Sequence, residues 1–341
     1  MTDVVNLFSD TQTRPSAAMK QAMVDAEVGD EQRFADPTTL RLERRTAELL
    51  GHEAAVFLPT GTMCNEIALR LHARPGGDEL LLDRTAHPIV AESGGPAQLA
   101  GLMIQTLDGE GGIFTGAQVE AALRPAGDRY HPRSRIVSVE QTTNMAGGRV
   151  WPLETLRGVL ETAARHDLRT HLDGARLLNA VVASDTSAAD HAGGFDTAWL
   201  DFTKGLGAPL GAVLCGSREL IDEAWRWKQM LGGALRQSGI VAAACLYALD
   251  HNVERLATDH EHARLLAERL TELGVELLAP PETNIVIAVV DDGPARAERL
   301  AAEGVEVTPV AADRIRCVTH LDVDRAGIDR ACEAFGRALL S

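Results

Sequence analysis

The sequence predicts an α/β fold in which a large domain, built on a mostly parallel sheet, precedes a smaller α+β domain. Short apolar strands alternate with helical stretches up to about residue 250, the pattern of a parallel sheet covered by helices. Beyond that point the alternation is lost, and 341 residues exceed the length of most single hydrophobic cores. We therefore expect an N-terminal arm over residues 1–14, a large domain over residues 15–250 and a small C-terminal domain over residues 251–341.

Apolar periodicity and the positions of glycine and proline give the expected elements. Pro15 begins a helix that runs to Ala26, and a helix over residues 38–50 ends at Gly51. A strand over residues 54–58 leads through a short turn into a helix over residues 64–73. Further strands are expected at residues 79–83, 103–107, 135–140, 170–173, 197–201 and 211–215, a helix-rich region at 240–273, and strands of the small domain at 284–290 and 314–319.

Composition indicates small molecules as partners. The net charge of −16 and the pI of about 5.1 argue against binding to nucleic acid or an anionic membrane, because phosphate contacts need clustered Lys and Arg. The five cysteines form no Cys-x-x-Cys pair, and their odd number does not suggest a disulfide framework. The first residues have no basic or apolar leader, and no apolar run reaches membrane-spanning length. We expect a cytoplasmic protein.

Lys204, one of only three lysines, is the most informative residue for function. It lies in a glycine-rich loop between apolar segments, where an amine can be made nucleophilic enough to form a Schiff base with an aldehyde. Pyridoxal phosphate is the aldehyde that fits, and Asp173, at the end of another expected strand, can pair with its pyridine nitrogen. A surface lysine and a helix-capping aspartate would explain these two residues as well, so other segments have to decide.

Three more residues fit the same cofactor. Gly61 and Thr62 lie between a strand and a helix, where backbone amides can hold a phosphate, although Gly61 could simply permit a tight turn. His87 follows a strand and could stack on a conjugated ring or relay a proton, although a lone histidine is more often structural.

Several arginines could bind anions. Arg176 lies three residues after Asp173, and Arg316 lies in the expected small domain; either could grip a carboxylate through two hydrogen bonds. The segment around Arg236 mixes basic and glycine residues, which suits a subunit contact or a second phosphate clamp, and a plain helix-loop-helix explains it nearly as well.

No metal site and no dinucleotide site is expected. His260 and His262 are two residues apart and do not share a helix face, so with His251 we expect them to be solvated. The glycines of residues 205–211 have the wrong spacing for a dinucleotide fingerprint and follow a lysine, not a strand, which argues against a dehydrogenase.

Taken in order, these segments resemble the threonine aldolase family of pyridoxal-phosphate enzymes, the β-eliminating lyase group of fold type I. The resemblance runs almost end to end. Its pieces are Ser9-Asp-Thr-Gln-Thr-Arg-Pro15, Asp36-Pro-Thr38, Leu58-Pro-Thr-Gly-Thr-Met-Cys-Asn65, Glu92-Ser-Gly-Gly95, Asn144-Met-Ala-Gly-Gly148, His171-Leu-Asp-Gly-Ala-Arg-Leu-Leu-Asn179, Thr203-Lys-Gly-Leu-Gly-Ala-Pro209 and Val318-Thr-His-Leu-Asp322.

The resemblance implies a role for each matching position. Lys204 matches the Schiff-base lysine, Asp173 the partner of the pyridine nitrogen, and His87 the histidine that stacks on the ring. The phosphate-binding turn is matched by Gly61 and Thr62, with Arg236 as a helper that can come from a neighbouring subunit. The groups that hold the substrate carboxylate are matched by Ser9, Arg176 and Arg316. Family members are typically homotetramers whose active sites form between paired subunits, and we expect the same here.

Two positions depart from the family pattern near the substrate side chain. Arg33 stands where the family often has tyrosine, and Thr143 stands where it often has histidine. The absent histidine leaves more of the contact with the substrate hydroxyl to His87. Arg33 could pair with a surface carboxylate or reach an acidic substrate, so threonine need not be the best substrate.

The sequence therefore predicts an L-threonine aldolase that cleaves L-threonine, L-allo-threonine and related β-hydroxy-α-amino acids to glycine and an aldehyde. His87, or a water that it orients, is the candidate base for the hydroxyl proton. The alternatives are β-elimination or dehydration of a β-substituted amino acid on the same scaffold, and a non-catalytic binding module that keeps the fold.

Overall fold

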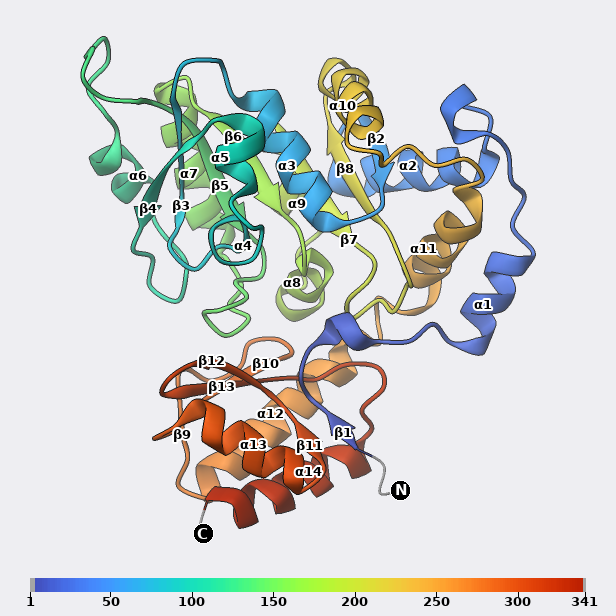
Figure 1. The fold of residues 1–341 in the computed structure, drawn as a ribbon, viewed down its shortest axis with the longest axis vertical. Coiled ribbons are helices and arrows are strands. Elements are labelled where there is room, and N and C mark those ends of the chain that lie inside the picture. Colours follow the sequence, from blue (N-terminus) through green and yellow to red (C-terminus); the bar gives the residue numbers. More distant parts are fainter. Residues whose placement is uncertain (1–3, 340–341) are drawn as a thin grey trace.

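The computed structural model describes residues 4–339 and contains a large α/β part and a small α+β part (Figure 1). Within these residues the strands form a seven-stranded, a four-stranded and a two-stranded sheet. The expected fold class is confirmed. The strands are β1 (Val5–Asn6), β2 (Ala54–Leu58), β3 (Asp78–Asp83), β4 (Met103–Leu107), β5 (Arg133–Glu140), β6 (Arg169–Asp173), β7 (Thr197–Asp201), β8 (Ala212–Gly216), β9 (Glu276–Leu277), β10 (Ile285–Val289), β11 (Val305–Glu306), β12 (Thr308–Ala311) and β13 (Arg314–Val318).

The seven-stranded sheet has the order β2-β8-β7-β6-β5-β3-β4, and all its strands are parallel except β8, which runs antiparallel to both β2 and β7. Helices cover both faces, so the strands β3, β7 and β8 are buried along their whole length. Along β2, for example, Phe57 belongs to the largest core cluster, whereas Val56 and Leu58 belong to the cluster on the opposite face. The sheet therefore has two buried faces, as the alternation of short apolar strands with helical stretches predicted.

The largest core lies under α2 (Pro37–Leu50), α6 (Gly116–Ala122), α7 (Leu153–Arg165), α8 (Leu177–Ser184), α9 (Ala188–Ala192) and α11 (Gly239–His251). The opposite face carries α3 (Gly61–His72) and α10 (Arg218–Met230). Two short helices, α4 (His87–Val90) and α5 (Gly95–Ala100), follow β3. The helix expected at residues 64–73 thus begins three residues earlier, because Thr60 caps it through a hydrogen bond to the amide of Met63.

The small part packs α12 (Leu256–Glu272), α13 (Gly293–Ala302) and α14 (Arg325–Leu339) against the antiparallel sheet β12-β13-β10-β9 and has its own core. The helix-rich region expected at residues 240–273 is in fact two helices, α11 and α12. The sequence analysis missed the two-residue strands β1, β9 and β11, because such short strands carry no periodicity of their own.

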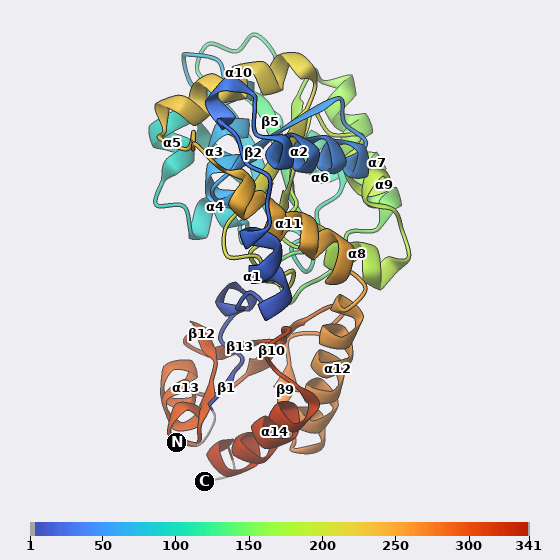
Figure 2. The same ribbon diagram turned by 90° about the vertical axis from the view of Figure 1, so that its right-hand side faces the viewer.

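The N-terminal segment connects the two parts. Its strand β1 pairs with β11 of the small part, whereas α1 (Ala17–Val24) lies beside α11 of the large part (Figure 2). Between them lies η1 (Asp10–Gln12), a short 3-10 helix whose Asp10 accepts a hydrogen bond from Arg176 of the large part. The domain limits at residues 14 and 250 remain predictions.

One expectation about the histidines is wrong. His260 and His262 lie on the buried face of α12 and are not solvated, whereas His251 at the end of α11 is exposed. Burial lowers the pKa of His260 to about 4 and so favours its neutral form. Among residues 4–339, no helix combines the length and the apolarity needed to cross a membrane.

Candidate active site

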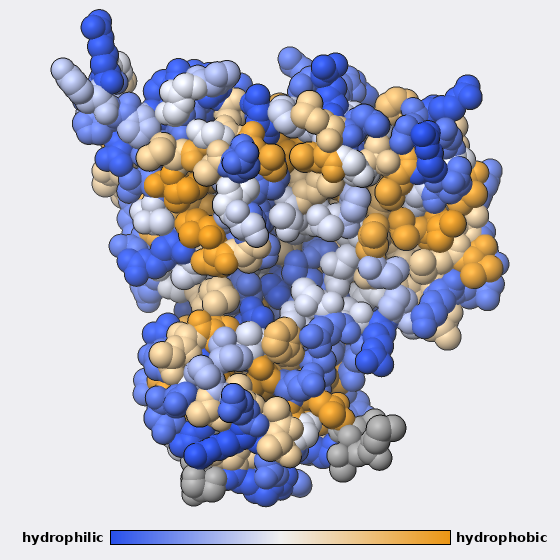
Figure 3. Space-filling view, in the orientation of Figure 1, coloured by the Kyte–Doolittle hydropathy of each residue, from blue (hydrophilic) through white to orange (hydrophobic). Residues whose placement is uncertain are grey.

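A cavity of about 420 Å³ lies at the carboxyl ends of β6 and β7, where an open α/β sheet usually binds its ligand. It brings together five of the residues singled out in the sequence: Gly61, Thr62, His87, Asp173 and Lys204. They come from four segments, namely the start of α3, the start of α4, the end of β6 and the turn after β7. Seen from the front, hydrophilic side chains surround a hollow between the large and small parts (Figure 3).

The start of α3 forms one wall of the cavity. The amides of Gly61 and Thr62 are the first two of a twelve-residue helix and have no acceptor within it, so they suit an anion. A Cβ at Gly61 would lie 2.2 Å from the ring of Trp199. Gly61 is therefore required by the close approach of Trp199 and not by a tight turn.

Lys204 lies in the turn that follows β7, and its Nζ contacts the carboxylate of Asp201. The turn is fixed at its backbone, because the carbonyl of Lys204 accepts hydrogen bonds from the hydroxyl of Thr13 (2.8 Å) and the amide of Gly207 (2.9 Å). Gly207 has a φ of 75°, a left-handed conformation that favours glycine. The lysine is thus presented to the cavity by a well-supported turn.

Asp173 is buried at the end of β6 and is held by two donors. Its Oδ1 accepts from the amide of Ala175 (3.0 Å), and its Oδ2 accepts from Nδ2 of Asn65 (2.8 Å). The same Nδ2 donates to Oε1 of Glu92 at 2.7 Å. Asn65 therefore joins the two carboxylates, and its Oδ1 must accept from its remaining neighbours.

Those neighbours form a directed chain of hydrogen bonds. Trp199 Nε1 and His171 Nε2 both donate to Oδ1 of Asn65, at 2.7 and 3.0 Å. Because His171 is a neutral imidazole, with a pKa lowered by burial to about 3, its Nδ1 accepts from the hydroxyl of Thr197 (2.8 Å). That hydroxyl in turn accepts from Nε2 of His72 at 2.8 Å. In this series of hydrogen bonds, every donor is directed toward Asp173 and Glu92.

His87 begins α4 and its Nδ1 donates to Glu92 at 2.7 Å. This hydrogen bond, with the fields of Asp173 and Glu92, raises the pKa of His87 above its usual value. Because Nδ1 is engaged, Nε2 is the ring nitrogen left for the cavity, which the His87 side chain lines.

Two buried arginines lie next to this site without lining the cavity. Arg176 donates to both carboxylate oxygens of Asp10, at 2.8 and 2.7 Å, and this pair raises the pKa of Arg176. Arg316 donates to Oδ1 of Asn144 at 2.7 Å. Burial and the positive charge of Arg176 lower the pKa of Arg316 to about 10.

The other expected site residues lie outside the cavity of this single chain. The buried hydroxyls of Ser9 and Thr143 accept hydrogen bonds from the amides of Thr11 and Arg149. Arg236 is exposed and pairs with Asp30 at 3.6 Å, and Arg33 is exposed on η2 (Glu31–Arg33).

The sequence analysis did not single out Asn65, Glu92, Trp199, Asp10 or Glu140 as site residues. Glu140 lies opposite Asp173 in the register of β5 and β6, and burial together with the charge of Asp173 raises its pKa to about 7. For Asn65 a signal was present, because it follows the expected phosphate turn by one helical turn. The remaining residues reach the site only through the tertiary fold.

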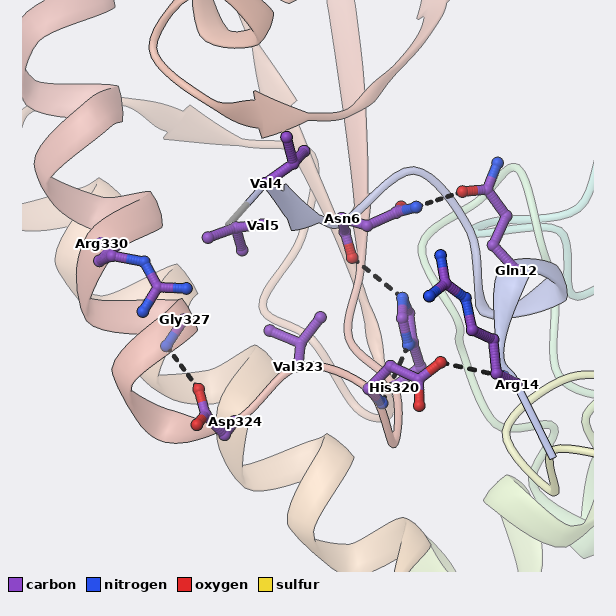
Figure 4. Close-up of a pocket in the computed structure, with 11 residues that line it drawn as sticks. Val4, Val5, Asn6, Gln12, Arg14, His320, Val323, Asp324, Gly327 and Arg330 are labelled. Atoms are coloured by element: carbon purple, nitrogen blue, oxygen red, sulfur yellow. Dashed lines mark hydrogen bonds between the residues drawn. The ribbon is translucent and has the colours of Figure 1, made fainter. Parts of the chain in front are cut away.

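A second cavity, of about 550 Å³, separates the N-terminal arm from α14 (Figure 4). His320 donates to the carbonyl of Asn6 at 2.9 Å, and the amide of Arg14 donates to Asp322 at 2.9 Å. These contacts attach the arm to the small part. No lysine lines this cavity among the described residues, so it is not a second site of the same kind.

Comparison with known proteins identifies the family. The β-eliminating lyase family model matches residues 6–293. A low-specificity L-threonine aldolase of Escherichia coli (strain K12) is 40% identical over 325 residues, covering 94% of this chain and 95% of that protein. The chain belongs to the β-eliminating lyase family. A probable low-specificity L-threonine aldolase of Arabidopsis thaliana is 39% identical, covering 97% of this chain and 96% of that protein.

A solved structure supports the fold of this β-eliminating lyase family member. A threonine aldolase of Leishmania major superimposes with a TM-score of 0.84 at 20% identity, covering 98% of this chain and 99% of that one. The expected family and the expected fold type are both confirmed.

The cavity residues fit pyridoxal phosphate, the cofactor that the resemblance predicted. The cavity offers an amine for the aldehyde in Lys204, a buried carboxylate for the ring nitrogen in Asp173, and free helix amides for the phosphate at Gly61 and Thr62. Because Gly61 has no Cβ, the indole ring of Trp199 can pack directly against the start of α3.

Proposed function

We propose that this protein is a pyridoxal-phosphate-dependent L-threonine aldolase that cleaves L-threonine, L-allo-threonine and related β-hydroxy-α-amino acids to glycine and an aldehyde. The observation that carries the proposal is that Lys204, Asp173 and the free amides at the start of α3 line one cavity. The names of the relatives from Escherichia coli and Arabidopsis thaliana support the substrate class.

Each residue has a role in this proposal. Lys204 would hold the cofactor through its aldehyde, Asp173 would pair with the ring nitrogen, and the amides of Gly61 and Thr62 would hold the phosphate. His87, which lines the same cavity, would help to hold the ring. When bound, the cofactor draws electrons away from the substrate Cα and so makes the bond between Cα and Cβ breakable.

The substrate carboxylate is assigned to Arg316 and Arg176, with Ser9 beside them. Arg316 is 8% exposed and has no ion pair with a carboxylate within the described residues, and burial and the positive charge of Arg176 lower its pKa. A substrate carboxylate would supply the missing counter-charge. Asp10 holds the plane of Arg176 in place, which leaves Nη1 of Arg176 for the substrate.

The β-hydroxyl proton is assigned to Nε2 of His87. Glu92 binds Nδ1 and fixes the tautomer in which Nε2 is the acceptor. Removal of the hydroxyl proton allows the C–O bond to become the carbonyl of the departing aldehyde while the bond between Cα and Cβ breaks. Return of a proton to Cα completes glycine.

Assembly as a homotetramer in the cytoplasm is part of the same proposal. Large apolar side chains are exposed on α1 and α11, where Val24 and Ile240 are 77% and 45% exposed. Arg236 and Arg33 are also exposed, and a partner subunit would bring them to its active site. Of the five cysteines, none is paired, which agrees with a reducing compartment.

The test is aldehyde release from L-threonine by the purified protein with added pyridoxal phosphate, beside D-threonine and the variants Lys204→Ala and Lys20→Ala. Lys20 is an exposed lysine of α1 and serves as the matched control. We expect acetaldehyde and glycine from the L-isomer alone, lost in Lys204→Ala and kept in Lys20→Ala. Release of keto acid and ammonia in place of aldehyde would contradict the proposal in favour of β-elimination.

A further inference from the structure

Glu66 is a buried carboxyl group that the proposed chemistry does not use. It lies on α3 one residue beyond Asn65 and is 5% exposed. Neither of its two oxygens has a hydrogen-bond donor among the described residues, and the same is true of Oε2 of Glu92. Three buried acceptor oxygens without donors are costly, so a proton must be present among them.

The arrangement of the two carboxyl groups shows where that proton belongs. The carboxyl group of Glu66 lies against Gly95, three residues beyond Glu92, and both Glu66 and Glu92 carry a buried oxygen without a donor. Oε1 of Glu92 already accepts from Nδ1 of His87 and Nδ2 of Asn65, both at 2.7 Å, as an ionised carboxylate does. Burial and the neighbouring charge of Glu92 raise the pKa of Glu66 to about 8, so Glu66 is the neutral partner near neutral pH.

Gly95 packs directly against the carboxyl group of Glu66. A Cβ at Gly95, the first residue of α5, would lie 1.8 Å from Oε1 of Glu66, so any side chain there would displace the carboxyl group. Gly95 therefore seats Glu66 against Glu92. The amide of Gly95 also donates to the carbonyl of Glu92 at 2.9 Å, which holds the two segments together.

We infer that Glu66 is a positioning residue for His87: as a neutral acid it donates a hydrogen bond to Oε2 of Glu92 and so fixes the carboxylate that orients His87 and Asn65. The inference deepens the proposed function, because it rests on His87 as the base. In this arrangement Glu92 accepts from three donors, and its plane can rotate only if one of those hydrogen bonds breaks.

The charged groups around this cluster are few. Glu92 is the ionisable group whose field acts on Glu66, and the groups that act on His87 are Glu92, Asp173 and Glu140, from the loop before α5 and from β6 and β5. A change at Glu66 therefore reaches His87 through Glu92.

The experiment uses the full chain without cofactor and compares wild type with Glu66→Gln, Glu66→Leu and Glu43→Gln. Glutamine keeps a donor for Glu92, whereas leucine removes it. Glu43, on α2, is a matched control, because burial raises its pKa to about 7 and its carboxylate accepts from the amide of Phe57 at 2.9 Å, away from His87. The readouts are the nitrogen resonances of the His87 imidazole during a pH titration and the infrared carbonyl band of protonated carboxyl groups.

We expect a carboxyl band in wild type that disappears as the pH rises through about 8 and is missing in Glu66→Gln. His87 should titrate in Glu66→Gln and Glu43→Gln as in wild type. In Glu66→Leu its pKa should rise, because Glu92 then concentrates its charge on the hydrogen bond to His87. An unchanged His87 titration in Glu66→Leu, or no carboxyl band lost in Glu66→Gln, would overturn the inference.

Turnover adds a second readout. With cofactor and L-threonine, Glu66→Leu should lose about tenfold in kcat/KM and shift its pH profile, while Glu66→Gln should stay within about twofold of wild type. An equal loss in both variants would contradict a positioning role. If no variant and no wild-type sample released aldehyde, the proposed function would fail, while the titration of His87 would still decide the role of Glu66.

Discussion

At the scale of single residues, charge and burial together indicate which groups await a ligand. Burial and the positive charge of Arg176 lower the pKa of Arg316, and of these two arginines only Arg176 has an ion pair within the described residues, with Asp10. The Nε of Arg316 has no acceptor within residues 4–339. A buried guanidinium with an unused donor is unfavourable unless an anion binds, which is why we assign the substrate carboxylate to it.

Substitution of Arg316 should therefore weaken substrate binding. We expect Arg316→Gln to lose about 2 kcal/mol of interaction with the carboxylate, roughly a thirtyfold fall in kcat/KM carried mainly by KM. Steady-state kinetics with L-threonine measure both constants. Arg325→Gln, at an exposed arginine that pairs with Asp329 on α14, is the control and should change neither. A fall confined to kcat would show that Arg316 does not bind the ground-state carboxylate.

At the scale of elements, α3 organises most of the site. Its first turn offers amides to a phosphate, and Asn65, in the second turn, joins Asp173 to Glu92. The carboxyl group of the next residue, Glu66, lies against Gly95, three residues beyond Glu92. The position of α3 depends on Trp199 of β7, which lies against Gly61 and donates to Asn65. A shift of this helix would move the phosphate site and the ring-nitrogen site together.

Gly61→Ala tests this dependence. The added methyl group would overlap the ring of Trp199, so we expect a loss of about 1–3 kcal/mol in the free energy of unfolding and weaker cofactor binding. Urea unfolding and absorbance titration with pyridoxal phosphate measure the two effects.

Gly158→Ala is the control for Gly61→Ala. Gly158 lies inside α7, where a Cβ would meet nothing within 4 Å, so the same substitution should stabilise by about 0.5–1 kcal/mol. Equal stability of the two variants would mean that the contact with Trp199 does not constrain α3.

At the scale of the whole molecule, the N-terminal segment couples the large and small parts. Its strand β1 pairs with β11. Its Asp10 carboxylate accepts hydrogen bonds from Arg176 of the large part and, at 3.1 Å, from Nδ2 of Asn284 in the small part. Asp10 is completely buried, and Arg176 holds its pKa well below the usual range. One carboxylate thus links three segments that are remote in sequence.

The stability of the molecule should depend on this carboxylate in a pH-dependent manner. Because the pKa of Asp10 is lower in the folded chain than in the unfolded one, its contribution is present above an unfolded-state pKa of 3.8 and is lost as the pH falls toward the folded value. Asp10→Asn should be about 3 kcal/mol less stable than wild type at neutral pH, since it leaves Arg176 buried without a counter-charge. The difference should narrow only below about pH 4.

Urea unfolding of wild type and Asp10→Asn across this pH range makes the measurement. Asp250→Asn, which removes a half-exposed partner of Arg45, is the control and should change little. A difference between wild type and Asp10→Asn that stayed constant from neutral to acidic pH would contradict the assignment.

The large part could be predicted well from the sequence because its signals are local. Short, largely apolar runs with helical stretches between them specify β2, β3, β7 and β8 to within about a residue. The direction of β8 was not predictable, because periodicity does not distinguish parallel from antiparallel pairing. The small strands were missed because pairing with partners far along the chain creates them, as with Val5 and Val305.

The sequence by itself determined the fold class, the family and the chemical groups of the candidate site: the lysine in its glycine turn, the aspartate at a strand end and the glycine at the start of α3. These depend on residue type and on neighbours within a few positions. Only the tertiary structure decided how they are held. Asn65 binds Asp173 across a sequence separation of 108 residues, and Asp10 binds Arg176 across 166. The carboxyl group of Glu66 is buried against Gly95 by the fold and so has no donor among the described residues. Burial and hydrogen-bond direction arise from such long-range contacts, which is why they are absent from any local pattern.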